Sequence, residues 1–329
     1  MLPHPPPRRR RRADHPRPRT RGVLVIEAAE TLWLDGELVR SDTTRAHLLT
    51  HTLHYGFGAF DGIRCYRQED GGRAMFRAGE HMRRLRDSAA ALSIPIEHTE
   101  EALVDAARRT IEANGLADAY VRPLVYVGEP NIIFAHWLND THTAVIAFAW
   151  SGYSDRNREE GTTATFSSHR RPKTHADLYK AKACGHYLLS VVAYSEAKRR
   201  GFAQAIFVDE DGMVCEATGE NIFAVHGSVV STPPASRSLL PGITRDTVMR
   251  LAADLGYEVV ERDLGTDDLL GASEVFSTGT ASELLPIPEI DGRKIGGGAF
   301  GPVTQALQRT MMDVVRGRVP DTRGWMTPI

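Results

Sequence analysis

The sequence predicts a two-domain α/β protein, in which a small α/β domain is followed by a larger, β-rich α/β domain. The chain has 329 residues, which is too long for one ordinary domain. Its first half contains helical patterns next to extended, strand-like runs, whereas the part beyond residue 161 contains short strands between closely spaced turns. Hydrophobic residues make up 42% and charged residues 25%, which is enough apolar material for a sizeable core.

Residues 1–21 are rich in proline and arginine, and residues 8–12 are an unbroken row of arginines. Like charges repel and prolines interrupt helices, so this segment is expected to be a disordered basic tail. It could be a nucleic-acid or targeting arm, or an inert extension, and a basic run alone favours the inert extension. No apolar stretch follows the positive charges, which argues against a secretory signal.

Residues 22–150 form the expected small domain. Asp35-Gly36 is a hairpin turn signal between two short apolar pairs. Apolar spacing predicts helices over residues 80–92 and 100–113, the second ending at Asn114-Gly115. Strands are predicted over residues 119–127 and 143–150.

Residues 151–161 are polar and without a clear period, and they are the expected interdomain loop. Residues 162–329 form the expected large domain. Four short strands, over residues 205–208, 213–215, 222–225 and 229–232, are separated by turn residues, which favours a meander over a βαβ series. Helices are predicted over residues 243–255 and 302–315, and no dinucleotide-binding fingerprint is present.

Charge and cysteine content exclude several classes of protein. A formal net charge of −2 gives the folded part no general attraction for nucleic acid, and no apolar run is long enough to cross a membrane. Cys65, Cys184 and Cys215 are widely spaced and form neither a disulfide framework nor a metal-ligand pair. We therefore expect a cytoplasmic protein without a bound metal.

Two lysines, Lys180 and Lys182, are surrounded by small and apolar residues. A lysine amine reacts with a carbonyl only after losing its proton, which an apolar setting favours. If this segment is extended, both side chains point to the same side, so spacing does not choose between them. Two ordinary surface lysines are the alternative.

Three further features are suited to a charged, ring-shaped cofactor. Glu216 ends a short strand at a turn, where a buried carboxylate could keep a pyridine nitrogen protonated. Pro241-Gly242-Ile243-Thr244 opens a predicted helix, whose free amides can bind an anion, although a simple helix cap is the alternative. The glycine-led turn Gly279-Thr280-Ala281-Ser282 exposes further amides.

The predicted strand over residues 119–127 places Tyr120 and Arg122 on one mostly apolar face. A buried arginine needs an anionic partner, such as a substrate carboxylate, unless its head reaches water. Tyr55 and Phe60 lie in a glycine-rich aromatic segment suited to an apolar pocket. Arg84, on the helix over residues 80–92, is a candidate phosphate ligand.

Taken together, these segments resemble class IV aminotransferases, the pyridoxal-5′-phosphate (PLP) enzymes of fold type IV, and most closely the bacterial branched-chain amino-acid aminotransferases. Seven segments match in family order and span about residues 23–317. They lie at residues 54–66, 80–85, 119–123, 182–188, 219–221, 241–245 and 278–283.

The resemblance implies individual roles. It selects Lys182 as the catalytic lysine that holds the cofactor, with Glu216 at the pyridine nitrogen and Tyr187 beside the ring. It implies a phosphate cup of Arg84, Ile243, Thr244 and Thr280. It also implies a substrate pocket of Tyr55, Phe60, Tyr120, Arg122, Tyr153 and the amides of Thr280 and Ala281, in which Arg122 meets the distal carboxylate of glutamate.

The implied activity is transamination of leucine, isoleucine and valine with 2-oxoglutarate. The resemblance also implies a homodimer or higher homo-oligomer, whose partners are small amino acids and 2-oxo acids and not nucleic acid or a membrane. Asp61 stands where the family usually has glutamate, and residues 131–141 diverge near the pocket. The alternatives are a D-amino-acid or (R)-amine transaminase, an aminodeoxychorismate lyase, or an aminotransferase of specialised metabolism. A nucleic-acid-binding protein and a PLP-binding protein without activity are more distant ones.

Overall fold

The computed structural model describes residues 29–152, 160–173, 176–298 and 300–329. The expected tail, residues 1–21, and the candidate pocket residue Tyr153 lie outside these ranges. Among the described residues, no helix combines the length and the apolar character that a bilayer crossing requires.

Seven strands from the first part of the chain and one from its C-terminal end build an eight-stranded sheet in the order β18-β5-β4-β6-β7-β1-β2, with β3 paired to β6. Its strands are β1 (Thr31–Leu34), β2 (Glu37–Arg40), β3 (Gly58–Phe60), β4 (Ile63–Arg67), β5 (Arg73–Phe76), β6 (Ala119–Val127), β7 (Thr141–Ala149) and β18 (Met326–Pro328). The expected hairpin is confirmed, since Asp35 (φ 49°) and Gly36 (φ 107°) both take the left-handed conformation at the β1–β2 turn. The two predicted long strands are β6 and β7.

Two long helices pack against this sheet: α2 (Ala78–Ala91) and α3 (Glu100–Ala113), close to the predicted ranges. They bury Met82, Leu85, Leu103 and Ile111 at helical spacing. The hydroxyl of Thr99 caps α3 by accepting a hydrogen bond from the amide of Ala102 at 3.2 Å. Shorter helical segments are α1 (His51–Tyr55) and η1 (His136–Leu138).

The rest of the chain forms two five-stranded sheets, ordered β10-β9-β8-β16-β17 and β13-β12-β11-β14-β15. The first contains β8 (Thr163–Phe166), β9 (Gln204–Val208), β10 (Val214–Ala217), β16 (Glu289–Ile290) and β17 (Arg293–Lys294). The second contains β11 (Asn221–His226), β12 (Val229–Thr232), β13 (Glu258–Glu261), β14 (Glu274–Gly279) and β15 (Glu283–Pro286). The helical segments here are η2 (Ala176–Lys180), η3 (Cys184–His186), α5 (Tyr187–Arg199), α6 (Ile243–Asp254), α7 (Thr266–Leu270) and α8 (Pro302–Val315).

The expected meander is wrong, although its four strands exist. β9–β10 and β11–β12 are local antiparallel hairpins that belong to different sheets. β8 pairs in parallel with β9 across α5, and β12 pairs in parallel with β13 across α6, so both connections are βαβ crossovers. The turn signals describe only the hairpins, because the parallel partners are set by long-range packing.

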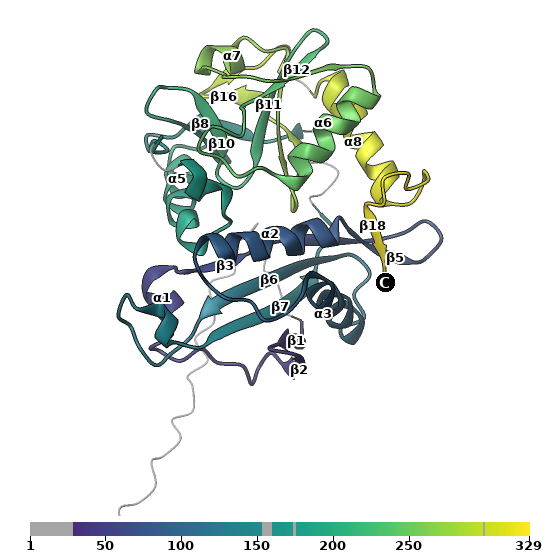
Figure 1. Cartoon of the computed structure of the whole chain (residues 1–329). Helices are drawn as coiled ribbons and strands as arrows, with labels where there is room; N and C mark the ends of the chain where they lie inside the picture. Colours follow the sequence, from purple (N-terminus) through teal and green to yellow (C-terminus); the bar gives the residue numbers. More distant parts are fainter. Residues whose placement is uncertain (1–28, 153–159, 174–175, 299) are drawn as a thin grey trace, which may run out of the picture.

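The expected interdomain loop over residues 151–161 stays a prediction, and strand pairing qualifies the range given to the large domain. β18, at the C-terminal end, pairs with β5 in the first sheet. Figure 1 shows this strand descending beside β5, and α2 on the side of the lower body that faces the upper body. Buried contacts join the two bodies, including Arg64 to Glu283 at 3.2 Å and Arg77 Nη1 to Thr247 Oγ1 at 2.8 Å.

Candidate active site

The structure distinguishes the two candidate lysines. Their segment is not extended, because η2 ends at Lys180 and η3 begins two residues after Lys182. Lys180 is exposed and forms an ion pair with Asp177 at 2.5 Å. Lys182 is partly buried, and its Nζ donates a hydrogen bond to the hydroxyl of Tyr187 at 2.7 Å. Of the two, Lys182 therefore faces another candidate site residue.

The backbone of Lys182 is fixed by the small sheet and by α2. Its carbonyl accepts a hydrogen bond from the Phe60 amide at 3.1 Å, and its own amide donates to Ser88 Oγ at 2.9 Å. The segment approaches so closely that a Cβ on Gly56 would lie 2.9 Å from the Cα of Gly185. Gly56 also has a φ of +63°, so glycine is required there for both reasons.

Glu216, on β10, lines the same cavity as Lys182 and Tyr187. One carboxylate oxygen accepts a hydrogen bond from Arg171 Nη2 at 2.9 Å, and the other accepts one from the Leu240 amide at 3.0 Å. Burial raises the pKa of Glu216, and the nearby Arg171, Leu240 amide and Lys182 oppose this only in part. The cavity thus contains a carboxylate whose ionised form would be stabilised by a further cationic hydrogen-bond donor.

Arg171 is a site residue that the sequence analysis missed. It is 3% exposed, and its guanidinium lies 4.7 Å from the Tyr179 ring and 4.5 Å from the Phe207 ring. Both distances are within the range of a cation–π contact, so the two rings hold the head that binds Glu216. The partners are 45 residues apart in sequence, and no local pattern connects them.

A second buried charge group surrounds Arg84. Asp61 accepts two hydrogen bonds from Arg84, through Nε and Nη2, each at 2.8 Å, and lies 2.8 Å from His81 Nδ1. Burial alone would raise the pKa of Asp61, but the adjacent Arg84 and His81 outweigh it and hold that pKa below its usual range. Asp61, the departure from the family pattern, is therefore the carboxylate that orients Arg84.

Arg84 lies at the start of α6, where an anion could bind. Its Nη1 is 3.3 Å from the carbonyl of Pro241, and α6 begins at Ile243 with Gly242 as its N-cap. No side chain of the described residues caps the first amides of α6, so those of Ile243 and Thr244 stay available at the positive end of the helix. A Cβ on Gly242 would overlap Asn221 Oδ1, so a larger residue in this turn would require the Asn221 side chain to move.

The predicted substrate face of β6 borders Lys182. Arg122 Nη2 donates to the Tyr120 hydroxyl at 3.2 Å, and the Arg122 guanidinium lies 4.6 Å from the Phe60 ring. Phe60 is in turn 4.7 Å from the ring of Tyr187. Arg122 Nε is buried without a hydrogen-bond partner among the described residues. These contacts bring the residues of β3 and β6 to the side of Lys182.

The turn of Thr280 and Ala281 is connected to this face through Trp150, which the sequence analysis also missed. The Trp150 indole donates to the Ala281 carbonyl at 3.2 Å, and its ring neighbours Phe148, which stacks on Tyr120. The sequence signal was a tryptophan at the end of a predicted strand, since a buried indole N–H needs an acceptor. Thr278 Oγ1 and Ser282 Oγ, on either side of the turn, are buried without partners among the described residues.

Tyr55 lies apart from the other predicted residues. Its hydroxyl donates to the Ile132 carbonyl at 2.6 Å, its ring contacts Phe134, and it is 45% exposed. Within one chain it does not line the cavity of Lys182 and Glu216.

The site as a whole fits PLP. Arg84 and the uncapped start of α6 provide for a phosphate, and Glu216 provides a buried acceptor for a ring nitrogen. Lys182 provides an amine held by Tyr187 between these two groups. Arg171 Nε, Thr278 Oγ1 and Ser282 Oγ, which are buried without partners in the described part of the chain, add polar atoms that a bound molecule could satisfy.

Comparisons with known proteins agree with this interpretation. The profile of amino-transferase class IV matches residues 58–290. The branched-chain-amino-acid aminotransferase of Salmonella typhimurium is 39% identical over 308 residues, 93% of this chain and 99% of that protein. The solved branched-chain aminotransferase of Escherichia coli has a TM-score of 0.85 at 39% identity and covers 91% of this chain and 98% of that one.

A solved relative also bears on the cofactor. The branched-chain aminotransferase of Thermobaculum terrenum, described in its PLP form, has a TM-score of 0.84 at 30% identity and covers 92% of this chain and 99% of that one. The predicted fold type and the predicted cofactor are confirmed. The chain thus belongs to amino-transferase class IV, among the branched-chain-amino-acid aminotransferases, and its cofactor is pyridoxal 5′-phosphate.

Proposed function

We propose that this enzyme transfers the amino group of leucine, isoleucine or valine to 2-oxoglutarate, giving the branched 2-oxo acid and L-glutamate, with Lys182 as its catalytic residue. The observation that carries the proposal is the hydrogen bond from Lys182 Nζ to the Tyr187 hydroxyl, in a cavity that also contains Glu216. PLP, when bound, stores the amino group between the two half-reactions and delocalises the electrons released at the substrate Cα.

Lys182 Nζ takes the proton from the substrate Cα and delivers it to C4′ of the cofactor. Tyr187 points Nζ in one direction, because its hydroxyl is a fixed hydrogen-bond partner on the adjacent turn. The contacts of Phe60 and Ser88 with the Lys182 backbone keep the base of the side chain in place. Such positioning favours a short proton transfer between defined atoms.

Glu216 accepts the hydrogen bond of the protonated ring nitrogen. Its raised pKa comes from burial, and a positive ring nitrogen would offset that burial. Arg84 and the amides of Ile243 and Thr244, with the Thr280 hydroxyl, hold the phosphate. The Tyr120 hydroxyl and the amides of Thr280 and Ala281 bind the substrate α-carboxylate.

One pocket has to accept both a branched apolar side chain and the distal carboxylate of glutamate. Phe60 and Tyr187 supply apolar walls, and Arg122 lies against Phe60 at 4.6 Å. An arginine–carboxylate pair out of water is stronger than a neutral hydrogen bond, but a leucine side chain cannot use it. Arg122 thereby serves glutamate and 2-oxoglutarate more than leucine.

The test is Arg122→Met, with each half-reaction followed by the cofactor's absorbance. We expect kcat/KM for glutamate and 2-oxoglutarate to fall roughly ten- to a hundredfold, the scale of one charge-assisted hydrogen bond. Leucine, isoleucine and valine should change much less. Arg40→Met, an exposed arginine on β2 of the same sheet, is the matched control and should change neither.

Equal losses for leucine and glutamate would assign Arg122 to the α-carboxylate or to the fold instead. The same assay with D-amino acids and (R)-amines separates this activity from that of other class IV enzymes. A preference for either over leucine would overturn the proposed substrate class.

A homodimer in which Tyr55 reaches the pocket of the other copy is part of this proposal. Near Tyr55, large apolar side chains are exposed: Leu48 (83%), Leu53 (61%), Phe134 (83%) and Trp137 (73%). Contiguous exposed apolar surface of this kind is typical of a protein interface. Phe134→Asp should give a monomer with little activity in light scattering and assay, and an active wild-type monomer would contradict the dimer.

We place the reaction in the cytosol, a reducing compartment. Cys65, Cys184 and Cys215 are all free thiols in the structure. Burial raises the pKa of Cys65 to about 11 and that of Cys215 to about 12, which keeps both thiols unreactive near neutral pH.

A further inference from the structure

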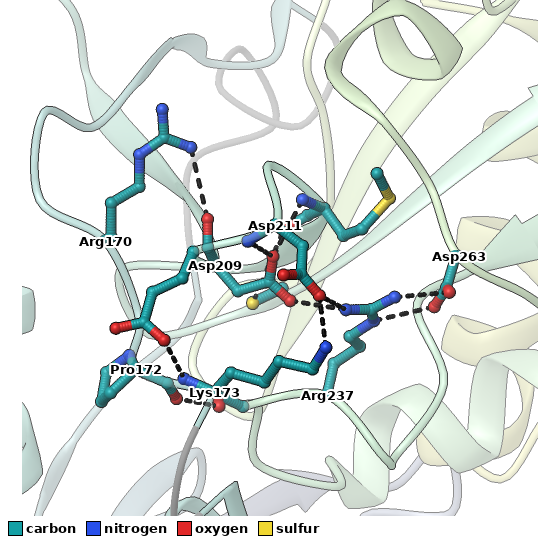
Figure 2. A network of polar contacts seen from close by, with 11 residues as sticks. Arg170, Pro172, Lys173, Asp209, Asp211, Arg237 and Asp263 are labelled. Atoms are coloured by element: carbon teal, nitrogen blue, oxygen red, sulfur yellow. Dashed lines mark hydrogen bonds and ion pairs between the residues drawn. The ribbon is translucent and has the colours of Figure 1, made fainter.

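The loop over residues 233–242, between β12 and α6, is held near both ends and in its middle. Arg245 Nη2 donates to the Pro233 carbonyl at 2.8 Å, Asn221 Nδ2 donates to the Leu240 carbonyl at 2.9 Å, and Arg237 forms the contacts in the middle. Figure 2 shows Arg237 between two acidic residues from different segments, Asp209 and Asp263. Nη1 donates to Asp209 Oδ2 at 2.7 Å, Nε donates to Asp263 Oδ1 at 2.8 Å, and Nη2 donates to the other Asp263 oxygen. Only 14% of the Arg237 side chain is exposed.

The rest of this loop reaches both ends of the cofactor site. Ser238 Oγ donates to the Pro172 carbonyl at 2.5 Å, and the Leu240 amide donates to Glu216 Oε2 at 3.0 Å. Pro241 and Gly242 then lead into the first turn of α6, beside Arg84. A displacement of this loop would therefore move one of the two hydrogen-bond donors of Glu216.

Asp209 connects Arg237 to the other donor of Glu216. Asp209 follows β9, is 1% exposed, and accepts the amides of Asp211 and Met213, each at 3.0 Å. The Arg171 amide donates to the carbonyl of Val208 at 3.0 Å, which docks the Arg171 segment on the same strand end. Arg237 thus bridges the strand end that holds Arg171 and the loop that carries Leu240.

The neighbouring lysine pair is a weaker anchor. Lys173 and Asp211 are paired at 2.5 Å, but their side chains are 60% and 46% exposed. Exposed pairs contribute little, whereas the planar guanidinium of Arg237 binds Asp263 through two donors and the buried Asp209 through a third. Arg237 is therefore the member of this network that holds the middle of the loop, and its loss would leave only the contacts near the two ends of the loop in place.

We propose that Arg237 is a positioning residue for Glu216: by joining Asp209 to Asp263 it fixes the Leu240 amide and the Arg171 guanidinium on the two carboxylate oxygens. This inference rests on the proposed role of Glu216 at the ring nitrogen. It predicts that a residue outside the cavity controls the charge state at one end of the cofactor.

The test compares Arg237→Gln and Arg237→Lys with wild-type holoenzyme, using Arg200→Gln as the matched control. Arg200 is an exposed arginine of the same part of the chain, paired with Asp291 at 3.1 Å, outside the contacts of Arg237. Five quantities are measured: the midpoint of the pH titration of the bound cofactor's absorbance, the affinity of apoenzyme for PLP, kcat for leucine, KM for leucine, and the Tm.

For Arg237→Gln we expect a shifted absorbance midpoint, kcat lowered roughly tenfold as for other residues that orient a reacting group, and KM for leucine changed less than about twofold. Arg237→Lys should recover part of both losses, and Arg200→Gln should change neither. A lower Tm with unchanged midpoint, PLP affinity and kcat would reduce Arg237 to a structural residue and overturn the proposal.

If Arg237→Gln does not fold, Asp263→Asn tests the same contact with a smaller change, since the Asp263 side chain is 52% exposed. It should shift the midpoint in the same direction, and no shift would contradict the proposal. Glu216→Gln separates this inference from the proposed function. If Glu216→Gln loses turnover but Arg237→Gln leaves the absorbance midpoint and kcat unchanged, only the role of Arg237 is refuted. Normal turnover in Glu216→Gln would refute the role of Glu216 itself.

Discussion

The two ends of the proposed cofactor site each contain a buried carboxylate bound to an arginine, yet the pKa values of the two carboxylates are shifted in opposite directions. At the phosphate end, Asp61 binds Arg84 through both oxygens and also contacts His81, and its pKa is lowered. At the nitrogen end, Glu216 has one hydrogen bond from Arg171 and one from a neutral amide, and its pKa is raised by burial.

The difference suggests a different role for each carboxylate. Asp61 accepts two hydrogen bonds from the Arg84 guanidinium and contacts His81, so it can orient Arg84 but has little capacity left for a ligand. Glu216 accepts only one hydrogen bond from a guanidinium, so a cationic ring nitrogen would offset the cost of burying its charge. The two carboxylates thus differ in how many of their hydrogen bonds come from a charged side chain of the protein.

The largest expected effect is that of Glu216→Gln. Glutamine keeps the shape but cannot hold the ring nitrogen in its protonated form, so kcat should fall roughly 10²- to 10³-fold, the scale of losing one electrostatic contact in a transition state. PLP should remain bound. Steady-state kinetics at saturating PLP and absorbance of the purified protein measure the two quantities.

Glu210→Gln, an exposed glutamate on the β9–β10 turn, is the control for this change and should be neutral. Normal turnover of Glu216→Gln would remove the distinction between the two carboxylates. Loss of PLP together with turnover would show that Glu216 serves binding more than catalysis.

At the phosphate end, Arg84→Ala should weaken binding before it weakens turnover. Losing a charge-assisted contact to the phosphate should raise the Kd of apoenzyme for PLP roughly ten- to a hundredfold, with a smaller loss of kcat once PLP saturates. Arg83→Ala is the matched control, since the Arg83 side chain lies next to Arg84 on α2 but is 63% exposed and pairs with Glu100. A kcat loss at saturating PLP larger than the change in Kd would place Arg84 in the chemistry.

The residues of the two ends differ in how far the sequence predicts their positions. Helix and strand patterns located α2, α3, β6 and α6, so Arg84, Tyr120, Arg122 and Thr244 were placed on the right elements. Spacing could not choose Lys182 over Lys180, because it assumed an extended segment where the chain forms two short 3-10 turns. The choice came from the family resemblance, and the Tyr187 hydrogen bond now supports it.

The partners of Glu216 and Asp61 were beyond local patterns. Arg171 meets Glu216 across 45 residues, and Arg84 meets Asp61 across 23. Trp150 contacts the Ala281 turn across 131 residues. Such pairs are set by the parallel crossovers and by packing between the two bodies, which periodicity within one element does not encode.

The smallest expected effect is a difference between the two ends in how ligand affinity depends on pH. For the nitrogen end, the ligand is pyridoxine 5′-phosphate with its ring nitrogen protonated. This ligand lacks the aldehyde and therefore cannot react with Lys182. If a lysine of the site or the phosphate of the ligand titrates, it does so in wild type and in Glu216→Gln alike. Its effect on binding therefore cancels in the ratio of the two affinities. For the phosphate end the ligand is sulfate, which does not change charge between about pH 5 and 8, and wild type is compared with Arg84→Ala.

Glu216 has a raised pKa, so it takes up a proton as the pH falls toward that pKa and before an ordinary glutamate does, and its attraction for a protonated ring is then lost. The affinity ratio of wild type to Glu216→Gln should therefore be about ten at pH 8, the size of one charge-assisted bond, and should fall as the pH is lowered toward 5. Asp61 has a lowered pKa and stays ionised throughout, and burial lowers the pKa of His81, which favours its neutral form. The ratio of the sulfate affinities of wild type and Arg84→Ala should accordingly not change with pH. Isothermal titration of the apoenzymes measures both ratios, and if they fall together, the two carboxylates share one charge state and the contrast between the two ends is lost.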